Sequence, residues 1–336
     1  MVWLDNARIV AMFAVVVLHT AAGVVVNHPI GSSSWWVGNF YDALVRWCVP
    51  VFVMISGALL LNPAKKEDLT VFFLKRLSKI MLPILFWTAF YALWAALRAP
   101  TDGQHLEMAS LATVVLSGAP YFHLWFLYMM ACLYLFVPFL LKTIGHTPRF
   151  DMAVLVLLLF AFAGLNAVAV YQGFTTSRLF TDGFLSYIPY FILGQVVRVS
   201  ACHGSRQSLW GIFGLSVVLT ALGCYGVASR HGLFAGLYFY DYLSVTVIPM
   251  SASLFCLLKF WERPMGSPKF TRQLSALTLG IYLIHPVFLE TMTFPADGLR
   301  GLTAAITIPA QSVVVFCLSA STVWIISKIP YIRRVI

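Results

Sequence analysis

The chain of 336 residues is 60% hydrophobic and only 10% charged, whereas a soluble domain carries roughly 25% charged residues. These proportions exclude an ordinary soluble enzyme and predict an all-α, multi-pass transmembrane bundle. The formal net charge of +10 could suggest a nucleic-acid-binding protein. However, the basic residues lie in short loops between apolar segments, so orientation in the bilayer explains them better and no nucleic-acid partner is expected.

Ten apolar segments have about the 20 residues that a helix needs to cross a bilayer. They run over residues 7–27, 41–61, 77–98, 121–141, 150–170, 183–199, 209–229, 239–258, 273–293 and 303–327. The sixth is short, and the ninth is expected to be interrupted by Pro286. No connection is long enough for a soluble domain, so residues 1–336 are expected to form a single integral membrane domain.

The distribution of basic residues predicts the orientation of these spans. If the N-terminus is cytoplasmic, the inner segments hold sixteen Lys and Arg residues. The outer loops then hold only Arg98, Arg178, Arg230 and Arg300. Because cytoplasmic loops of membrane proteins are enriched in Lys and Arg, we expect both termini to be cytoplasmic.

The first predicted span carries ionisable side chains at unusual depths. Arg8 lies near its start, and His19 lies deep inside an otherwise apolar run. An ionisable group at that depth is costly, so it indicates a functional site. The eleven helical steps between the two residues place both on one face, about 16 Å apart. The structural alternative is that Arg8 snorkels to the surface and His19 is hydrogen-bonded to a neighbouring helix.

A basic segment follows the second predicted span. It runs from Lys65 to Lys79 and is expected to form a cytoplasmic loop and an amphipathic helix. Lys75 and Lys79 share a helix face at a spacing of four, beside Arg76. Such a group could hold the phosphates of a nucleotide-like ligand. Contact with anionic lipid is the alternative.

A third group of polar and aromatic residues collects toward the outer ends of the predicted spans. It comprises Asp42, Arg46, His123, Trp125, Asp241, Tyr282, His285 and Glu290. Asp42 and Arg46 can form an ion pair at a helical spacing of four. The aromatic members also fit the interfacial belt of a membrane protein. Aromatic faces beside carboxylates and hydroxyls would suit a sugar, so we treat the group as a candidate acceptor-binding site.

Motifs along nearly the whole chain together resemble those of the membrane acyltransferase-3 family. In order they are Leu4-Asp-Asn-Ala-Arg8 leading to His19, Val51-Phe-Val-Met-Ile-Ser-Gly57, Phe72-Phe-Leu-Lys-Arg-Leu-Ser-Lys-Ile-Met-Leu-Pro83, His123-Leu-Trp-Phe-Leu-Tyr128, Tyr190-Phe-Ile-Leu-Gly194 and Gly280-Ile-Tyr-Leu-Ile-His-Pro286. None is specific alone, but their number and order make the resemblance strong. The chain looks most like the short branch of the family that lacks a fused soluble domain.

The resemblance implies an enzyme that moves an acyl group, usually acetyl, from cytoplasmic acyl-coenzyme A to a hydroxyl of a cell-envelope glycan or lipid-linked sugar. It implies that His19 is the catalytic histidine, that Arg8 is its partner, and that Lys75 and Lys79 form the basic pair near coenzyme A. Many relatives have arginines in that pair, and lysine lacks the rigid bidentate fork of arginine. The resemblance also implies a location in the bacterial inner membrane.

The residues and the resemblance agree on a mechanism. Arg8, Lys75, Arg76 and Lys79 would hold the phosphates of acetyl-coenzyme A. His19, with an ordinary pKa of about 6.5, would remove the proton of the acceptor hydroxyl as general base. The sequence leaves direct transfer and a transiently acetylated histidine both open.

A transporter or flippase for a polar solute or a lipid-linked sugar is the alternative function, because many spans and ionisable residues within the membrane fit it equally well. The basic cluster at one face and the lack of an evident inverted repeat favour the enzyme. No ligand set with metal-binding spacing is evident, so no metal is expected. The sequence does not indicate the oligomeric state.

Overall fold

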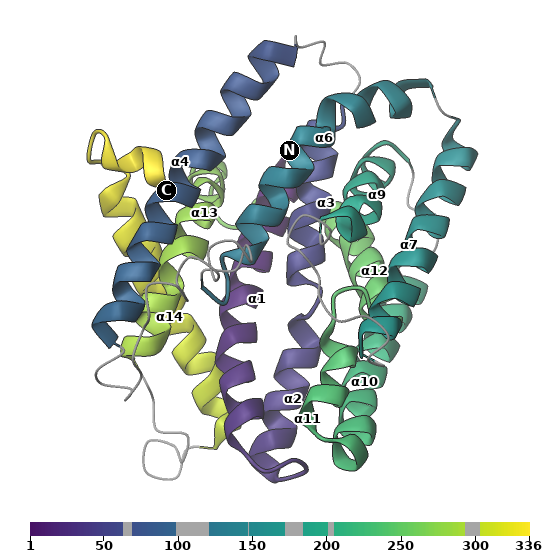
Figure 1. The fold of residues 1–336 in the computed structure, drawn as a ribbon, viewed down its shortest axis with the longest axis vertical. Coiled ribbons are helices and arrows are strands. Elements are labelled where there is room, and N and C mark those ends of the chain that lie inside the picture. Colours follow the sequence, from purple (N-terminus) through teal and green to yellow (C-terminus); the bar gives the residue numbers. More distant parts are fainter. Residues whose placement is uncertain (63–68, 99–120, 147, 172–183, 201–204, 293–302) are drawn as a thin grey trace.

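The computed structural model describes residues 1–62, 69–98, 121–146, 148–171, 184–200, 205–292 and 303–336. Within these ranges all regular secondary structure is helical, which confirms the all-α class (Figure 1). The elements are α1 (Val2–Asn27), α2 (Ser33–Val45), α3 (Cys48–Leu60), α4 (Leu69–Arg98), α6 (Trp125–His146), α7 (Arg149–Tyr171), η1 (Leu185–Tyr187), α9 (Ile188–Val199), α10 (Arg206–His231), α11 (Leu233–Gly236), η2 (Leu237–Tyr240), α12 (Val247–Lys259), α13 (Pro268–Thr291), α14 (Ala304–Ile326) and η3 (Ile332–Val335).

The described residues include 7 helices that are long and apolar enough to cross a membrane, with α2 and α3 together forming one of them. Shorter apolar helices cover Phe150–Leu165, Leu185–Val199 and Val247–Lys259. Every one of these segments overlaps a span expected from the sequence. The count of ten spans and the cytoplasmic location of the termini stay predictions. In Figure 1 both termini lie in the upper half of the molecule.

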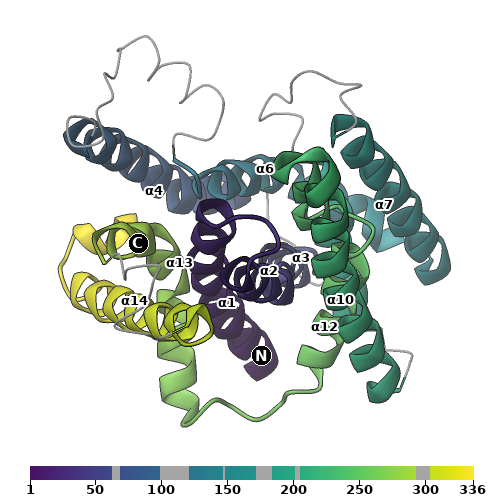
Figure 2. The same ribbon diagram turned by 90° about the horizontal axis from the view of Figure 1, so that it is seen from below.

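Helix α1 occupies the centre of the bundle. It packs against α2, α3, α12, α13 and α14, and Figure 2 shows it between the α13–α14 pair and the α10–α12 pair. Most of its side chains are therefore buried, including Ala7, Ala11 and Val16. Among the polar residues of α1, Asn6 and Thr20 are buried, and Asp5, Arg8 and His19 are half-buried.

Two expected spans differ in detail from the observed helices. The span over 41–61 is divided at Arg46 and Trp47, where α2 ends and α3 begins. Pro50 is tolerated because it lies in the first turn of α3, where no intrahelical hydrogen bond is lost. The described part of the basic segment, residues 69–79, and the span over 77–98 form one helix, α4. Its 30 residues extend about 45 Å and exceed a bilayer core of about 30 Å.

The expected interruption at Pro286 was wrong, because α13 continues through this residue. A proline within a helix leaves the carbonyl four residues earlier without its backbone donor. Here that carbonyl belongs to Tyr282, and His285 Nδ1 lies 2.7 Å from it. Pro309 in α14 is accommodated similarly, since the Tyr41 hydroxyl donates to the carbonyl of Ala305 at 3.0 Å. Side-chain donors thus replace the missing backbone bonds.

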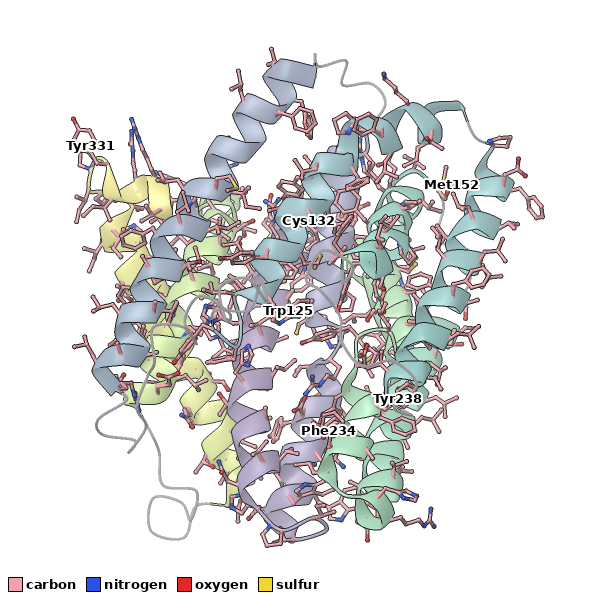
Figure 3. The ribbon with its side chains drawn as sticks, in the orientation of Figure 1. Trp125, Cys132, Met152, Phe234, Tyr238 and Tyr331 are labelled. Carbon is pink, nitrogen blue, oxygen red and sulfur yellow. The ribbon has the colours of Figure 1, made fainter. Side chains whose placement is uncertain are left out.

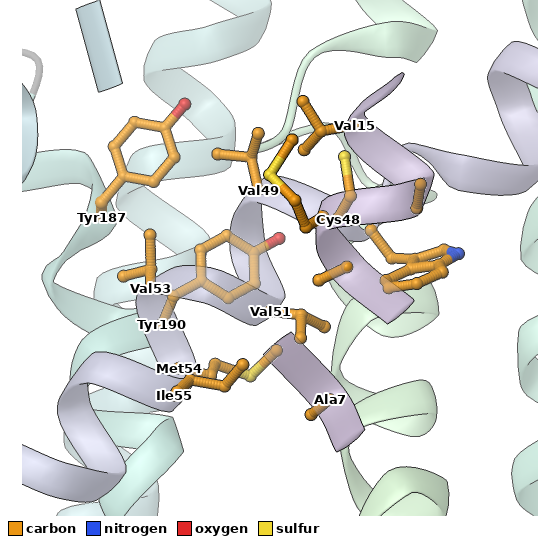
Figure 4. Close-up of a cluster of buried hydrophobic side chains, with 14 of the residues drawn as sticks. Ala7, Val15, Cys48, Val49, Val51, Val53, Met54, Ile55, Tyr187 and Tyr190 are labelled. Atoms are coloured by element: carbon orange, nitrogen blue, oxygen red, sulfur yellow. The ribbon is translucent and has the colours of Figure 1, made fainter. Parts of the chain in front are cut away.

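Helices α3 and α9 approach each other unusually closely. A Cβ atom at Gly57 would overlap the carbonyl oxygen of Phe191, and one at Gly194 would overlap the carbonyl oxygen of Met54. Small residues allow such contact between membrane helices. Figure 4 shows the apolar cluster beside this contact, with Met54 of α3 next to Tyr190 of α9. Gly57 and Gly194 each end a motif noted in the sequence. Because a Cβ atom at either position would overlap a backbone carbonyl, their role is to allow close helix packing.

We expect Gly57→Ala and Gly194→Ala each to lower the melting temperature of the detergent-purified protein by about 5 °C or more. The added methyl group forces two backbones apart, and overpacking costs roughly 1–3 kcal/mol. Thermal unfolding monitored by intrinsic fluorescence measures the effect. The matched controls are Gly211→Ala and Gly214→Ala in α10, where a Cβ meets nothing within 4 Å. Equal behaviour of all four variants would contradict the close-contact interpretation.

Candidate active site

A cavity of about 310 Å³ lies beside α1 and is lined by both Arg8 and His19. Its other walls come from α3, the start of α6, the segment before α12, and α13. The remaining lining residues are Val15, Val49, Phe52, His123, Trp125, Phe126, Tyr134, Tyr242, Ser275, Ala276, Thr278, Leu279 and Tyr282. The two residues singled out on the first predicted span therefore open into one space.

The Arg8 end of α1 is held in place by its polar neighbours. The Ser275 hydroxyl of α13 donates to Asp5 Oδ1 at 3.0 Å. Asn6 Nδ2 donates to the carbonyl of Arg263 at 2.8 Å, in the segment between α12 and α13. Asn6 is fully buried and Arg8 is half-buried. Asp5 and Asn6 thus fix the start of α1, and Arg8 faces the cavity.

Three histidines from distant parts of the chain gather around the other end of the cavity. The rings of His19 and His285 stack with centroids 5.3 Å apart and an interplanar angle of 25°. His123 lies with its centroid 5.5 Å from that of His285. His123 and His285 are buried, whereas His19 keeps part of its surface open to the cavity. Phe122 contacts His19 edge-on with centroids 4.9 Å apart, so the plane of the His19 ring is fixed from two sides.

The proline that follows His285 sets the orientation of this histidine. The Tyr282 carbonyl freed by Pro286 can only accept a hydrogen bond, so Nδ1 of His285 carries the proton. Nε2 of His285 has no hydrogen-bond partner among the described residues. His285 does not line the cavity itself, but it forms the flat surface against which His19 rests.

Two aromatic side chains form a wall next to the histidines. Trp125, which lies in the middle of the bundle in Figure 3, stacks with Tyr242 at a centroid distance of 5.9 Å and an angle of 24°. The Tyr190 hydroxyl of α9 donates to the Tyr242 carbonyl at 2.6 Å and so holds this segment. The sequence offered no signal that separates Tyr242 from the other tyrosines near the ends of spans.

Asp42 and Arg46 form the expected ion pair, with 2.5 Å between Arg46 Nε and Asp42 Oδ1. Asp42 is fully buried. The Arg46 guanidinium lies 4.2 Å from the centroid of the Tyr240 ring and 6.0 Å from that of Tyr242. The pair lies where α2 ends, and through Tyr242 it supports the wall of the cavity without lining it.

Glu290 belongs to a separate polar group. Its carboxylate accepts a hydrogen bond from the Tyr121 hydroxyl and pairs with Arg98 Nη1 at 3.4 Å. Tyr121 stacks on Tyr91 with centroids 4.4 Å apart, and the Tyr91 ring lies 4.9 Å from that of His123. The residues grouped from the sequence therefore divide between the cavity, its supporting wall and this more distant cluster.

Comparison with known proteins yields one match. A family model described as an acyltransferase domain, that of the acyltransferase-3 family, matches residues 1–328 of the chain. The chain belongs to the acyltransferase-3 family. No curated protein and no solved structure matches it. Family membership favours an enzyme over the transporter considered from the sequence, and identifies the protein as a membrane acyltransferase.

The basic residues assigned to the donor of this acyltransferase are only partly described. Lys75 and Arg76 lie on α4, but their side chains are outside the described part of the structure. Lys79 is exposed and is not among the described residues that line the cavity. Among the described residues, no group of His, Cys, Asp or Glu is placed to hold a metal ion.

The buried ion pair yields a test of how the acyltransferase supports its cavity. Arg46→Met should lower the free energy of unfolding by about 3–5 kcal/mol, because it leaves the Asp42 carboxylate buried without a counter-ion. The double variant Asp42→Asn/Arg46→Met should recover part of this loss, as measured by thermal unfolding. Arg230→Met, at an exposed arginine of α10, is the control. Strictly additive single effects would show that the two residues do not depend on each other.

Proposed function

We propose that this acyltransferase moves an acetyl group from acetyl-coenzyme A to a hydroxyl of a cell-envelope glycan or lipid-linked sugar, with His19 as general base. The observation that carries the proposal is the single cavity shared by Arg8 and His19. Their separation of about 16 Å along α1 lets one helix contact both the phosphate-bearing part and the reactive end of the donor. The expected location is the bacterial inner membrane.

The cavity suits the flexible arm of the donor. Its volume of about 310 Å³ lies at the lower end of small-molecule sites, which span roughly 300–1,000 Å³. Between Arg8 and His19 it is lined by apolar side chains such as Val15, Phe52 and Leu279. An uncharged pantetheine arm needs no charged partners, so it can lie along this stretch. The nucleotide would remain outside the cavity, and Lys75, Arg76 and Lys79 are the residues proposed to bind it.

His19 is suited to the proton transfer that this reaction needs. As the acceptor oxygen attacks the thioester carbonyl carbon, its proton passes to the His19 ring, and the carbon–sulfur bond then breaks. The leaving thiolate takes this proton from the His19 ring to give coenzyme A, which returns His19 to its neutral form. Stacking on His285 and edge contact with Phe122 hold the ring plane of His19, which is the fixed geometry that general-base catalysis requires.

The acceptor is proposed to enter against Trp125 and His123. Both line the cavity, and neither ring nitrogen of the buried His123 has a hydrogen-bond partner among the described residues. A buried polar group without a partner is costly. A sugar hydroxyl could supply that partner while the apolar face of the sugar packs on the Trp125 ring. Asp42, Arg46 and Tyr282 would support the part of the cavity beside Trp125 and His123, and Glu290 and His285 would lie behind it.

The first test replaces the proposed base. His19→Ala should reduce the rate of acetyl transfer by about 10²–10⁴-fold, because that is the usual contribution of a general base. The measurement is transfer of label from radiolabelled acetyl-coenzyme A to an envelope glycan fraction by protein in proteoliposomes. His231→Ala, at an exposed histidine at the end of α10, is the matched control. A folded His19→Ala variant with the wild-type rate would refute the proposal.

The second test addresses the donor. Arg8→Met should raise the KM for acetyl-coenzyme A by about 10–100-fold, because a hydrogen bond to a charged group contributes roughly 1.5–3 kcal/mol. Steady-state kinetics of the same labelled transfer give the KM, and Arg230→Met serves as control for loss of one positive charge. An unchanged KM with a reduced kcat would instead place Arg8 in the chemical step.

A further inference from the structure

A long groove lies along the side of the bundle formed by α13, α14 and the segment that follows α14. Two adjoining hollows of about 340 and 400 Å³ make up the groove and share Gln273, Leu277 and Trp324 in their linings. Small side chains keep it open, among them Gly280 and Ala320. This groove is distinct from the cavity that holds His19, although α13 contributes to both.

The two ends of the groove differ in chemistry. One end is bordered by the exposed Lys328 and Arg333, and no acidic residue is among the described residues that line either hollow. The rest is walled by apolar side chains that are more than half exposed, with Phe270 at 54%, Trp324 at 53% and Ile325 at 56%. The Lys328 ammonium lies 5.2 Å from the centroid of the Trp324 ring. The groove thus has a cationic end and an apolar part, here called the trough, which is walled by Phe270, Trp324 and Ile325.

Residues 328–336, here called the hook, carry Lys328 and Arg333 and so form the cationic end of the groove. Tyr331, labelled at the edge of the molecule in Figure 3, has φ 74° and ψ −55°. With the Ile332 amide donating to the Pro330 carbonyl at 3.0 Å, this forms a γ-turn of the strained kind. The hook is fixed to α4 by Trp87 Nε1, which donates to the carbonyl of the buried Val335 at 2.7 Å.

The strained turn has a structural consequence. Non-glycine residues with positive φ persist only where their surroundings enforce the conformation. Here the chain reverses at Tyr331 so that Val335 is buried and Arg333 borders the groove. A relaxed, extended segment would carry Arg333 away from Lys328. The fold therefore uses a strained turn and a buried hydrogen bond to bring these cations together.

We infer that this groove binds an anionic phospholipid, with the headgroup phosphate between Lys328 and Arg333 and an acyl chain along the trough. Basic pockets between transmembrane helices bind anionic headgroups. A free phosphate or a nucleotide could bind the two cations, but it has no apolar part that would fill the trough. The exposed Phe270, Trp324 and Ile325 lie on the outside of a transmembrane bundle, where hydrocarbon chains are the available apolar partners. The inference does not depend on the acyl donor or acceptor.

The test compares lipids on the intact, detergent-purified protein. Phosphatidylglycerol should raise the melting temperature of the wild type by about 3 °C or more, whereas phosphatidylcholine should not, because only a lipid that binds the folded state stabilises it. Lys328→Gln/Arg333→Gln should lose this difference. The control with the same loss of charge is Arg206→Gln/Arg230→Gln on α10, which lies on the other side of α1 in Figure 2. Native mass spectrometry should show a phosphatidylglycerol adduct retained by the control and lost by the groove variant.

Several results would overturn the inference. One is equal stabilisation of the wild type and the groove variant by phosphatidylglycerol, and another is no stabilisation of the wild type at all. A third is stabilisation by inorganic phosphate or coenzyme A that disappears in the groove variant, since the cations would then bind a soluble phosphate. Loss of acetyl transfer in His19→Ala has no bearing on these outcomes, so the two proposals fail separately.

Discussion

Every backbone carbonyl inside a membrane must find a donor within the protein, because lipid offers none. A proline within a helix removes one backbone donor, so a particular carbonyl needs a donor from elsewhere in the protein. Pro286 frees the carbonyl of Tyr282, and the side chain that satisfies it is His285. That bond also fixes the orientation of the ring on which His19 stacks. His285 and Pro286, which end one motif, therefore act together. Pro286 leaves the Tyr282 carbonyl without a backbone donor, and His285 bonds to this carbonyl and supports the ring of the proposed base, His19.

The motifs that resemble the family separate into two physical kinds. Gly57 and Gly194 allow the backbones of α3 and α9 to touch, and Tyr190 holds the segment that carries Tyr242. None of Gly57, Gly194 and Tyr190 lines the cavity, so they support it through helix packing and a hydrogen bond. Arg8, His19 and His123 instead line the cavity directly. A motif is thus evidence of family, but the structure is needed to tell which of its residues can meet a substrate and which hold helices together.

The sequence predicts the helices well because length and hydrophobicity alone decide whether a segment can span a bilayer. It also predicts the Asp42–Arg46 pair, since a spacing of four fixes neighbours on one helix. It fails where the outcome depends on contacts between helices. The continuity of α13 through Pro286 depends on a side-chain donor, and the separation of Glu290 from the cavity depends on Tyr121 and Tyr91. Likewise, nothing local distinguishes Tyr242 or Ser275, which reach the cavity because of how distant helices pack.

The placement of Arg8 and His19 on one central helix constrains the chemistry more than any loop could. Their separation is set by helical rise and their direction by helical rotation, so a shift of one residue would turn either side chain by about 100° out of the cavity. Asn6 and Asp5 prevent such a shift at one end by binding the α12–α13 segment and Ser275. Packing of α1 against five helices prevents it along the rest. In the proposed reaction, the donor would thus be bound by its charge at the Arg8 end and positioned at the His19 end without any movement of α1 itself.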